Sequence, residues 1–261
     1  NRPSGVTVDN SGNLYVADTR NNRICKFNAN GQYVKAWGKY PLPTTCSIDD
    51  ENNIYVLDAQ NIRKFSPNGD LLLLRPRGTE NNTFDNIHVG KVTGQIFKAK
   101  CWMHVFDHNF NIKNIDYSKV KPYSIPAAYC VWCIAEDSQG SLSCIALLKK
   151  EGKGANAAIY KFNRDGAYIN KLEFSTKDLN GPEAIAIDGQ GNMYICCTGS
   201  YSVAIIDASG IIISSFGSKG MKDGQFLQPK GICVDPEGKN VFVADSGNNR
   251  IAKWALQERQ K

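Results

Sequence analysis

PSGVTVDNSGNLYVADTRNNRI, residues 3–24, returns near the other end of the chain as PKGICVDPEGKNVFVADSGNNRI, residues 229–251. Each copy holds two short runs of apolar residues separated by a turn, then an Asp, and then Asn-Asn-Arg-Ile. A phrase that recurs with its letters in the same order indicates a duplicated structural unit, and such a unit decides the fold before any single residue does.

Weaker copies of the phrase fill the middle of the chain. Residues 43–65 and 182–207 keep both apolar runs, whereas residues 84–98 and 130–148 keep only their spacing. Six units of this kind account for almost all of the 261 residues. Their equivalent positions lie at steps of 40, 41, 47, 51 and 47 residues and are Asp9, Asp49, Gly90, Asp137, Asp188 and Asp235.

Each unit has the pattern of short strands and tight turns. In the first unit we expect strands at Gly5–Val8, Leu14–Ala17, Ile24–Phe27 and Tyr33–Trp37, because Gly, Asn and Asp separate these runs. Loops this short join antiparallel neighbours, and no long 3.6-residue apolar period indicates a helix. The sequence therefore predicts an all-β protein, a six-bladed β-propeller of four-stranded antiparallel blades.

We expect one domain over residues 1–261, with blades at approximately 3–40, 41–80, 81–122, 123–175, 176–222 and 223–261. The chain begins at Asn1 without Met, which we interpret as a domain of a larger protein or a processed product. Because only about ten residues follow Ile251, we expect three strands in the last blade. The polar stretch Leu148–Ala158 is interpreted as an extended hairpin loop.

The pattern Pro-x-Gly-Val/Ile-x-Val-Asp, Tyr/Phe-Val-Ala-Asp and Asn-Asn-Arg-Ile resembles the NHL repeat. Units one and six match closely, two and five moderately, and three and four only in spacing. The resemblance implies a six-bladed propeller like those of tripartite-motif (TRIM-NHL) proteins. It also implies a recognition or scaffold module, with ligase or scaffold functions carried elsewhere in a longer protein. Related propellers include metal-dependent lyases and lactonases, whose site lies in the central channel.

The repeated Asp and Arg residues favour a structural role over catalysis. Asp18, Asp58 and Asp245 recur with Arg23, Arg63 and Arg250, and a residue that holds each turn should recur whereas a catalytic residue should occur once. We therefore expect no catalytic residue and no enzyme activity in the propeller. The alternative is a metal-dependent lyase or lactonase with a central-channel site.

The histidines do not predict a metal site. His88, His104 and His108 are the only three, and on an extended strand residues four apart are separated by about 13 Å. Glu183 is the one acid expected among the channel-facing residues, too few for a hard cation. We expect no metal and no cofactor.

The distribution of charge along the sequence indicates a binding surface. The chain has 31 Lys and Arg against 25 Asp and Glu, a net charge of +6. In a propeller the turns between second and third strands and the links between blades share one face, which here is basic and carries Trp and Tyr, while the acids lie in the opposite turns. We expect this face to bind a protein partner, with single-stranded RNA as the alternative. The candidate binding residues are Arg20, Arg23, Arg63, Arg75, Arg77, Lys100, Trp102, Lys121, Tyr123, Tyr201, Lys222 and Arg250.

Compartment and assembly are predicted from simpler features. Nine cysteines, an odd number placed mostly in strand runs, favour reduced thiols and a cytoplasmic protein, with an extracellular location as the alternative. The chain has no apolar run of about 20 residues, so we expect no membrane insertion. We expect the propeller to be monomeric.

Overall fold

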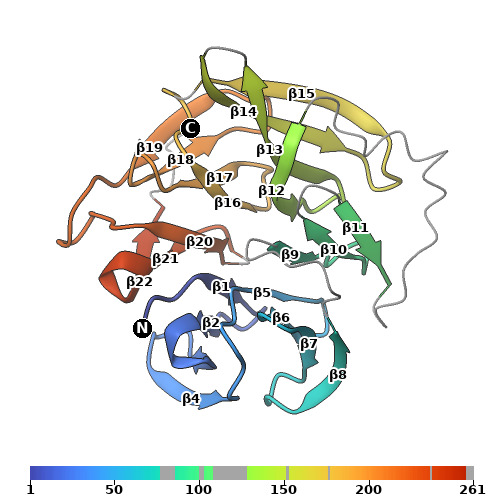
Figure 1. The fold of residues 1–261 in the computed structure, drawn as a ribbon, viewed down its shortest axis with the longest axis vertical. Coiled ribbons are helices and arrows are strands. Elements are labelled where there is room, and N and C mark those ends of the chain that lie inside the picture. The colour runs from blue at the N-terminus through green and yellow to red at the C-terminus, as the bar shows by residue number, and fades with distance from the viewer. Residues whose placement is uncertain are drawn as a thin grey trace.

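The computed structural model describes residues 1–76, 86–99, 103–107, 128–150, 153–175, 177–235 and 237–256, and structural statements here concern these residues. Its strands form six antiparallel sheets, one for each predicted blade, arranged around a central axis (Figure 1). Four sheets have four strands, and the third and sixth have three described strands each. The predicted six-bladed all-β propeller is therefore confirmed. Residues 108–127 and 257–261, which follow the third strands of these two blades, lie outside the described ranges.

The strands take equivalent places in each blade. The innermost strands are β1 (Gly5–Val8), β5 (Thr45–Ile48), β9 (Asn86–Val89), β12 (Ala128–Glu136), β16 (Pro182–Ile187) and β20 (Pro229–Val234). The second strands are β2 (Leu14–Asp18), β6 (Ile54–Leu57), β10 (Ile96–Ala99), β13 (Leu142–Lys150), β17 (Met193–Cys197) and β21 (Asn240–Asp245). The third strands are β3 (Arg23–Phe27), β7 (Asn61–Phe65), β11 (Met103–Phe106), β14 (Lys153–Phe162), β18 (Ser202–Ile206) and β22 (Arg250–Ala255). The outer strands are β4 (Tyr33–Trp37), β8 (Leu71–Pro76), β15 (Tyr168–Phe174) and β19 (Ile212–Phe216).

The predicted strands of the first unit agree with the structure to within one residue. Two 3-10 turns, η1 (Thr19–Asn21) and η3 (Ser246–Asn248), are the helical segments among the described residues. The interpretation of Leu148–Ala158 as a hairpin loop was wrong. Strands β13 and β14 continue through most of it, pairing as far as Lys150 with Lys153, because antiparallel partners of equal length keep their backbone groups bonded.

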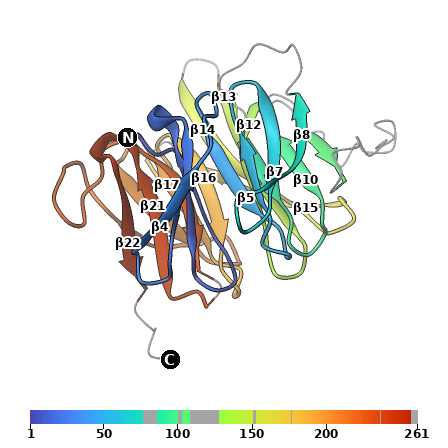
Figure 2. The same ribbon diagram turned by 90° about the horizontal axis from the view of Figure 1, so that it is seen from below.

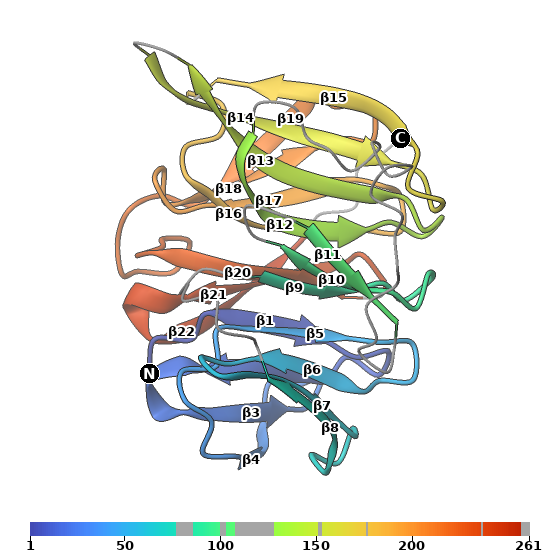
Figure 3. The same cartoon turned by 45° about the vertical axis from the view of Figure 1, so that its right-hand side comes forward.

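The inner strands form a closed ring. Each packs against the inner strand of the next blade, and β1 contacts both β5 and β20, so the first and last blades are neighbours (Figures 2 and 3). Apolar clusters fill the spaces between blades. One of them joins Val6 and Val16 of blade one to Phe242 and Ala244 of blade six. The ring thus closes through buried contacts between segments far apart in sequence.

Glycine allows the inner strands to approach one another. A Cβ atom at Gly5 would lie 2.7 Å from Thr45 Cα, and one at Gly231 would lie 2.5 Å from the carbonyl oxygen of Ser4. Both distances are shorter than any tolerable contact, so a larger residue would force the backbones apart. This explains the glycine of the Pro-x-Gly motif at the two junctions that blade one makes.

An aspartate organises the turn after several inner strands. In blade one, Asp9 Oδ1 accepts the N–H groups of Ser11 and Asn13 at 2.9 and 2.8 Å, and Oδ2 accepts the hydroxyl of Tyr15 at 3.1 Å. Burial, with the carboxylate of Asp9 next in importance, raises the pKa of Tyr15, so its hydroxyl stays a donor. Asp49 and Asp188 receive equivalent bonds from Tyr55 and Tyr194.

Seven cysteines, all buried, are free thiols in the described part of the chain. Burial raises the pKa of Cys46 and Cys144 to about 12, which keeps both thiols protonated and unreactive. The seven are Cys25, Cys46, Cys133, Cys144, Cys196, Cys197 and Cys233.

We predict that Gly231→Ala lowers the free energy of unfolding by about 1–3 kcal/mol, because the added methyl group overlaps the backbone of blade one. Urea titration measures the change. Gly189→Ala is the control: a Cβ there meets no atom within 4 Å. An unfolding midpoint for Gly231→Ala equal to that of Gly189→Ala would contradict the close approach.

Candidate functional site

The propeller has two faces set by the order of its strands. We call the face that carries the turns between second and third strands, and the links between blades, the connection face. The face that carries the remaining turns is the hairpin face. Figure 2 shows the strands running between them. The described members of the predicted binding set lie in or beside these turns and links.

Buried carboxylates hold the turns of the connection face. Asp58, whose side chain is wholly buried, accepts the N–H groups of Gln60 and Asn61 at 2.8 and 2.7 Å through Oδ1. Its Oδ2 accepts Nε of Arg63 at 2.6 Å. The expected structural role of the repeated Asp and Arg is confirmed in this blade, because one carboxylate satisfies both the turn and the guanidinium.

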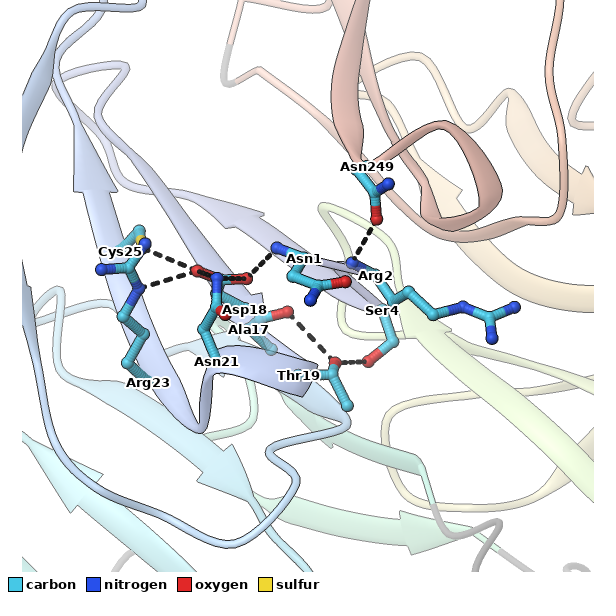
Figure 4. A network of polar contacts seen from close by, with 10 residues as sticks. All are labelled: Asn1, Arg2, Ser4, Ala17, Asp18, Thr19, Asn21, Arg23, Cys25 and Asn249. Atoms are coloured by element: carbon cyan, nitrogen blue, oxygen red, sulfur yellow. Dashed lines mark hydrogen bonds and ion pairs between the residues drawn. The ribbon is translucent and has the colours of Figure 1, made fainter. Parts of the chain in front are cut away.

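Blade one repeats this arrangement and extends it to blade six (Figure 4). Asp18 accepts Nε of Arg23 at 2.7 Å and Nδ2 of Asn21 at 3.0 Å. The backbone N–H of Arg2 donates to Oδ1 of Asn249 at 2.8 Å. The turn of blade six is thereby tied to the segment that leads into blade one.

Arg250 is the most heavily engaged of the repeated arginines. Its Nε donates to Asp245 at 2.9 Å, and its terminal nitrogens donate to the carbonyl oxygens of Met221, Lys222 and Gln225 at 3.1, 2.9 and 2.6 Å. The guanidinium therefore fastens the loop between β19 and β20. Of the three repeated arginines, Arg23 is the most exposed at 44%, against 30% for Arg250 and 12% for Arg63.

Two exposed cations of the predicted set, Arg20 and Lys222, have no intramolecular acceptor for their side chains in the described part of the chain. Arg20 lies in η1 at the mouth of the central channel, and Lys222 lies in the loop that Arg250 fastens. Arg75, half-buried on β8, is placed opposite Ile62. Arg20 and Lys222 can meet an anionic partner without breaking an intramolecular bond of the described residues.

Two described aromatic rings of the connection face, those of Tyr40 and Tyr201, are already covered by cations. Arg63 lies 4.6 Å from the ring centre of Tyr40, and the ammonium of Lys219 lies 5.3 Å from that of Tyr201. Both rings are half-buried. The other predicted residues lie outside the described ranges: Arg77, Lys100, Trp102, Lys121 and Tyr123.

Carboxylates are distributed differently on the two faces. On the connection face Asp18, Asp58 and Asp245 are buried and paired, and Asp178 and Asp223 are exposed. The hairpin face exposes further acids, including Asp50, Glu51 and Glu237.

A channel of about 980 Å³ runs along the axis between the six inner strands. His88 lines it, and Nε2 of this residue is buried without a hydrogen-bond partner. Burial, with a smaller contribution from Lys91, lowers the pKa of His88 to about 4, so the ring is neutral at pH 7. No group of three His, Cys, Asp or Glu side chains in the described ranges could hold a metal ion.

Sequence reasoning missed two channel residues, Trp132 and Lys230, which line the wall with Glu183. Each is an extra residue that bulges out of an inner strand. For Glu183 and Lys230 the available signal was their place as the middle residue of Pro-x-Ala or Pro-x-Gly, and Trp132 carries no such signal.

The NHL repeat family model matches residues 1–27 and 226–254, the first and last blades. Protein lin-41 of Caenorhabditis elegans is 50% identical over 46 residues, which is 18% of this chain and 4% of that protein. E3 ubiquitin-protein ligase TRIM71 of Xenopus tropicalis is 48% identical over 42 residues, 16% of this chain and 5% of that protein. The chain thus matches a small part of the length of these relatives.

Solved structures share the fold over nearly the whole chain. A gluconolactonase of Xanthomonas campestris superposes with a TM-score of 0.69 at 12% identity, covering 98% of this chain and 86% of that one. A streptogramin B lyase gives 0.65 at 14% identity, covering 96% and 92%. At these identities the likeness shows the propeller fold alone. No helix among the described residues has the length and apolar character needed to traverse a bilayer.

We predict that Asp58→Ala lowers the free energy of unfolding by about 3 kcal/mol or more, because Arg63 and two turn N–H groups lose a buried acceptor. Asp223→Ala is the matched control. Asp223 is fully exposed, and its ion pair with Arg250 is long, at 3.9 Å, so its loss should have little effect on stability. Thermal and urea unfolding compare the two variants. Equal stability of Asp58→Ala and the control would show that the buried carboxylate does not hold the turn.

Proposed function

We propose that this NHL-repeat β-propeller is a non-catalytic recognition module whose connection face binds an acidic segment of a protein partner. The observation that carries the proposal is the state of the charges on that face. Its buried carboxylates are already paired with arginines, whereas Arg20 and Lys222 are exposed and have no acceptor in the described part of the chain.

The relatives are consistent with a protein partner. The frog relative is named an E3 ubiquitin-protein ligase, and a ligase that modifies proteins needs a surface that holds its target. We extend to this chain only the idea of such a surface, on a monomeric propeller in the cytoplasm. The seven buried free thiols agree with a reducing compartment.

Single-stranded RNA is the second candidate, favoured by the net charge of +6. Bases stack on exposed aromatic rings, yet Tyr40 and Tyr201 are each covered by a cation. Stacking would therefore depend on Trp102 and Tyr123. The described residues favour the protein partner for this reason.

A metal-dependent lyase or lactonase remains the alternative function for the channel. This chain shares its fold with the gluconolactonase and the streptogramin B lyase. The observation against it is that His88 stands without two further ligand side chains in the described ranges. We predict that elemental analysis of the purified protein finds no stoichiometric metal; one tightly bound zinc or calcium ion per chain would support the enzyme instead.

We predict that the double variant Arg20→Glu/Lys222→Glu weakens binding of a glutamate-rich peptide at least about tenfold, because two attractive charges become repulsive. Fluorescence anisotropy measures the affinity at low and moderate salt, and binding of the unaltered protein should weaken as salt rises. Lys239→Glu, on the hairpin face beside Glu237, is the control.

Two results would contradict the proposal. One is peptide affinity that neither salt nor the double variant changes. The other is preferential, salt-dependent binding of an unstructured oligouridine, which would assign the face to RNA.

A further inference from the structure

Three consecutive blades place a bulged residue at the same level of the channel. On β12, Val131 pairs with Ala146 and Cys133 pairs with Ile145, so Trp132 is left over. The same break in register leaves over Glu183 on β16 and Lys230 on β20. A bulge redirects a side chain and often lies next to a functional site. All three residues line the channel, near its mouth on the connection face.

In the part of the chain that the structure describes, the side chains of Trp132, Glu183 and Lys230 form no hydrogen bond or ion pair. Trp132 Nε1 is buried without an acceptor, and a buried donor that makes no hydrogen bond costs free energy. Burial raises the pKa of Glu183, and the charge of Lys230 partly opposes that rise. The charges of Glu183 and Lys230 thus interact electrostatically between neighbouring blades, although no ion pair joins the two side chains within the described residues.

The equivalent residues of blades one and two, Ser4 and Thr44, differ because their hydroxyl groups already form hydrogen bonds within the fold. The hydroxyl of Ser4 donates to the carbonyl oxygen of Thr44 at 2.7 Å, and that of Thr44 donates to the carbonyl oxygen of Leu57 at 3.3 Å. At this level of the described inner strands, the side chains without a partner therefore belong to blades four to six.

An apolar collar lies two residues deeper along the inner strands. Its members line the channel and are 3–7% exposed. They are Val6, Cys46, Ile87, Ile134, Ile185 and Ile232. A ligand that enters past the three polar groups therefore meets a wall without charge.

We propose that this mouth is a binding site for a small zwitterion, an α-amino acid with an apolar side chain. The ammonium group of the ligand donates to Glu183. Its carboxylate accepts from the ammonium of Lys230, and its side chain passes the ring of Trp132 into the collar. Hydrogen bonds between charged partners are the strong ones, and a zwitterion supplies one for each charge of the site.

A ligand with a single charge fits less well. A bare cation would leave Lys230 repelled beside it, and a bare carboxylate would leave Glu183 repelled and desolvated. The site does not depend on the binding of an acidic segment to the connection face. The two proposals can fail separately, because amino-acid binding is measured without any macromolecular partner.

The first test uses the unaltered chain and three related probes. Isothermal titration calorimetry should show saturable binding of leucine. Isocaproate, which lacks the ammonium group, and isoamylamine, which lacks the carboxylate, should each bind at least about tenfold more weakly. The site is refuted if leucine gives no saturable heat at millimolar concentration. It is also refuted if isocaproate or isoamylamine binds as tightly as leucine, since the mouth then recognises a lone carboxylate or a lone cation.

The second test locates the site. Glu183→Gln and Lys230→Met should each weaken leucine binding at least about tenfold, because each removes one of the two charges that the zwitterion pairs with. Glu237→Gln and Lys239→Met make the same chemical changes at exposed positions of the hairpin face and should leave it unchanged. Equal affinity of Glu183→Gln and Glu237→Gln would place leucine elsewhere and overturn the assignment.

Discussion

The packing of six inner strands around one axis is the constraint on which the rest of the structure depends. Gly5 and Gly231 permit it where blade one meets its neighbours, since a methyl group at either position would overlap the adjacent backbone. The close approach places turns from distant parts of the chain at one rim. It also creates the channel and the buried clusters between blades. Both proposed sites follow from that ring.

The repeated Asp and Arg residues are of types found in catalytic sites, yet they have a structural role. Asp18, Asp58 and Asp245 hold their turns, and their arginine partners complete the same bonds. Because the carboxylates are already paired, the positive charge of the connection face is concentrated on side chains such as Arg20 that the fold does not use. Under the proposed function, structural pairing and partner recognition are divided between neighbouring residues of one turn.

The blades could be predicted because Gly, Asn and Asp mark each turn, as in the first unit, where the strands agree with the structure to within one residue. The length of β13 and β14 could not be predicted. The polar residues at their ends indicate a loop, but the two strands pair as far as Lys150 with Lys153. The bulge at Trp132 could not be predicted either, since no motif marks it and an extra residue is defined only by its partner strand. For the same reason the sequence could not show which arginines are already engaged by carboxylates.

Hydrogen exchange of backbone amides, with and without a bound acidic peptide, tests the central claim most directly. The account predicts added protection at the connection face, in the turns at Thr19–Asn22 and Ser246–Asn249, and no change at Asn10–Gly12 or Asp188–Gly191 on the hairpin face. Protection confined to the hairpin face would contradict it.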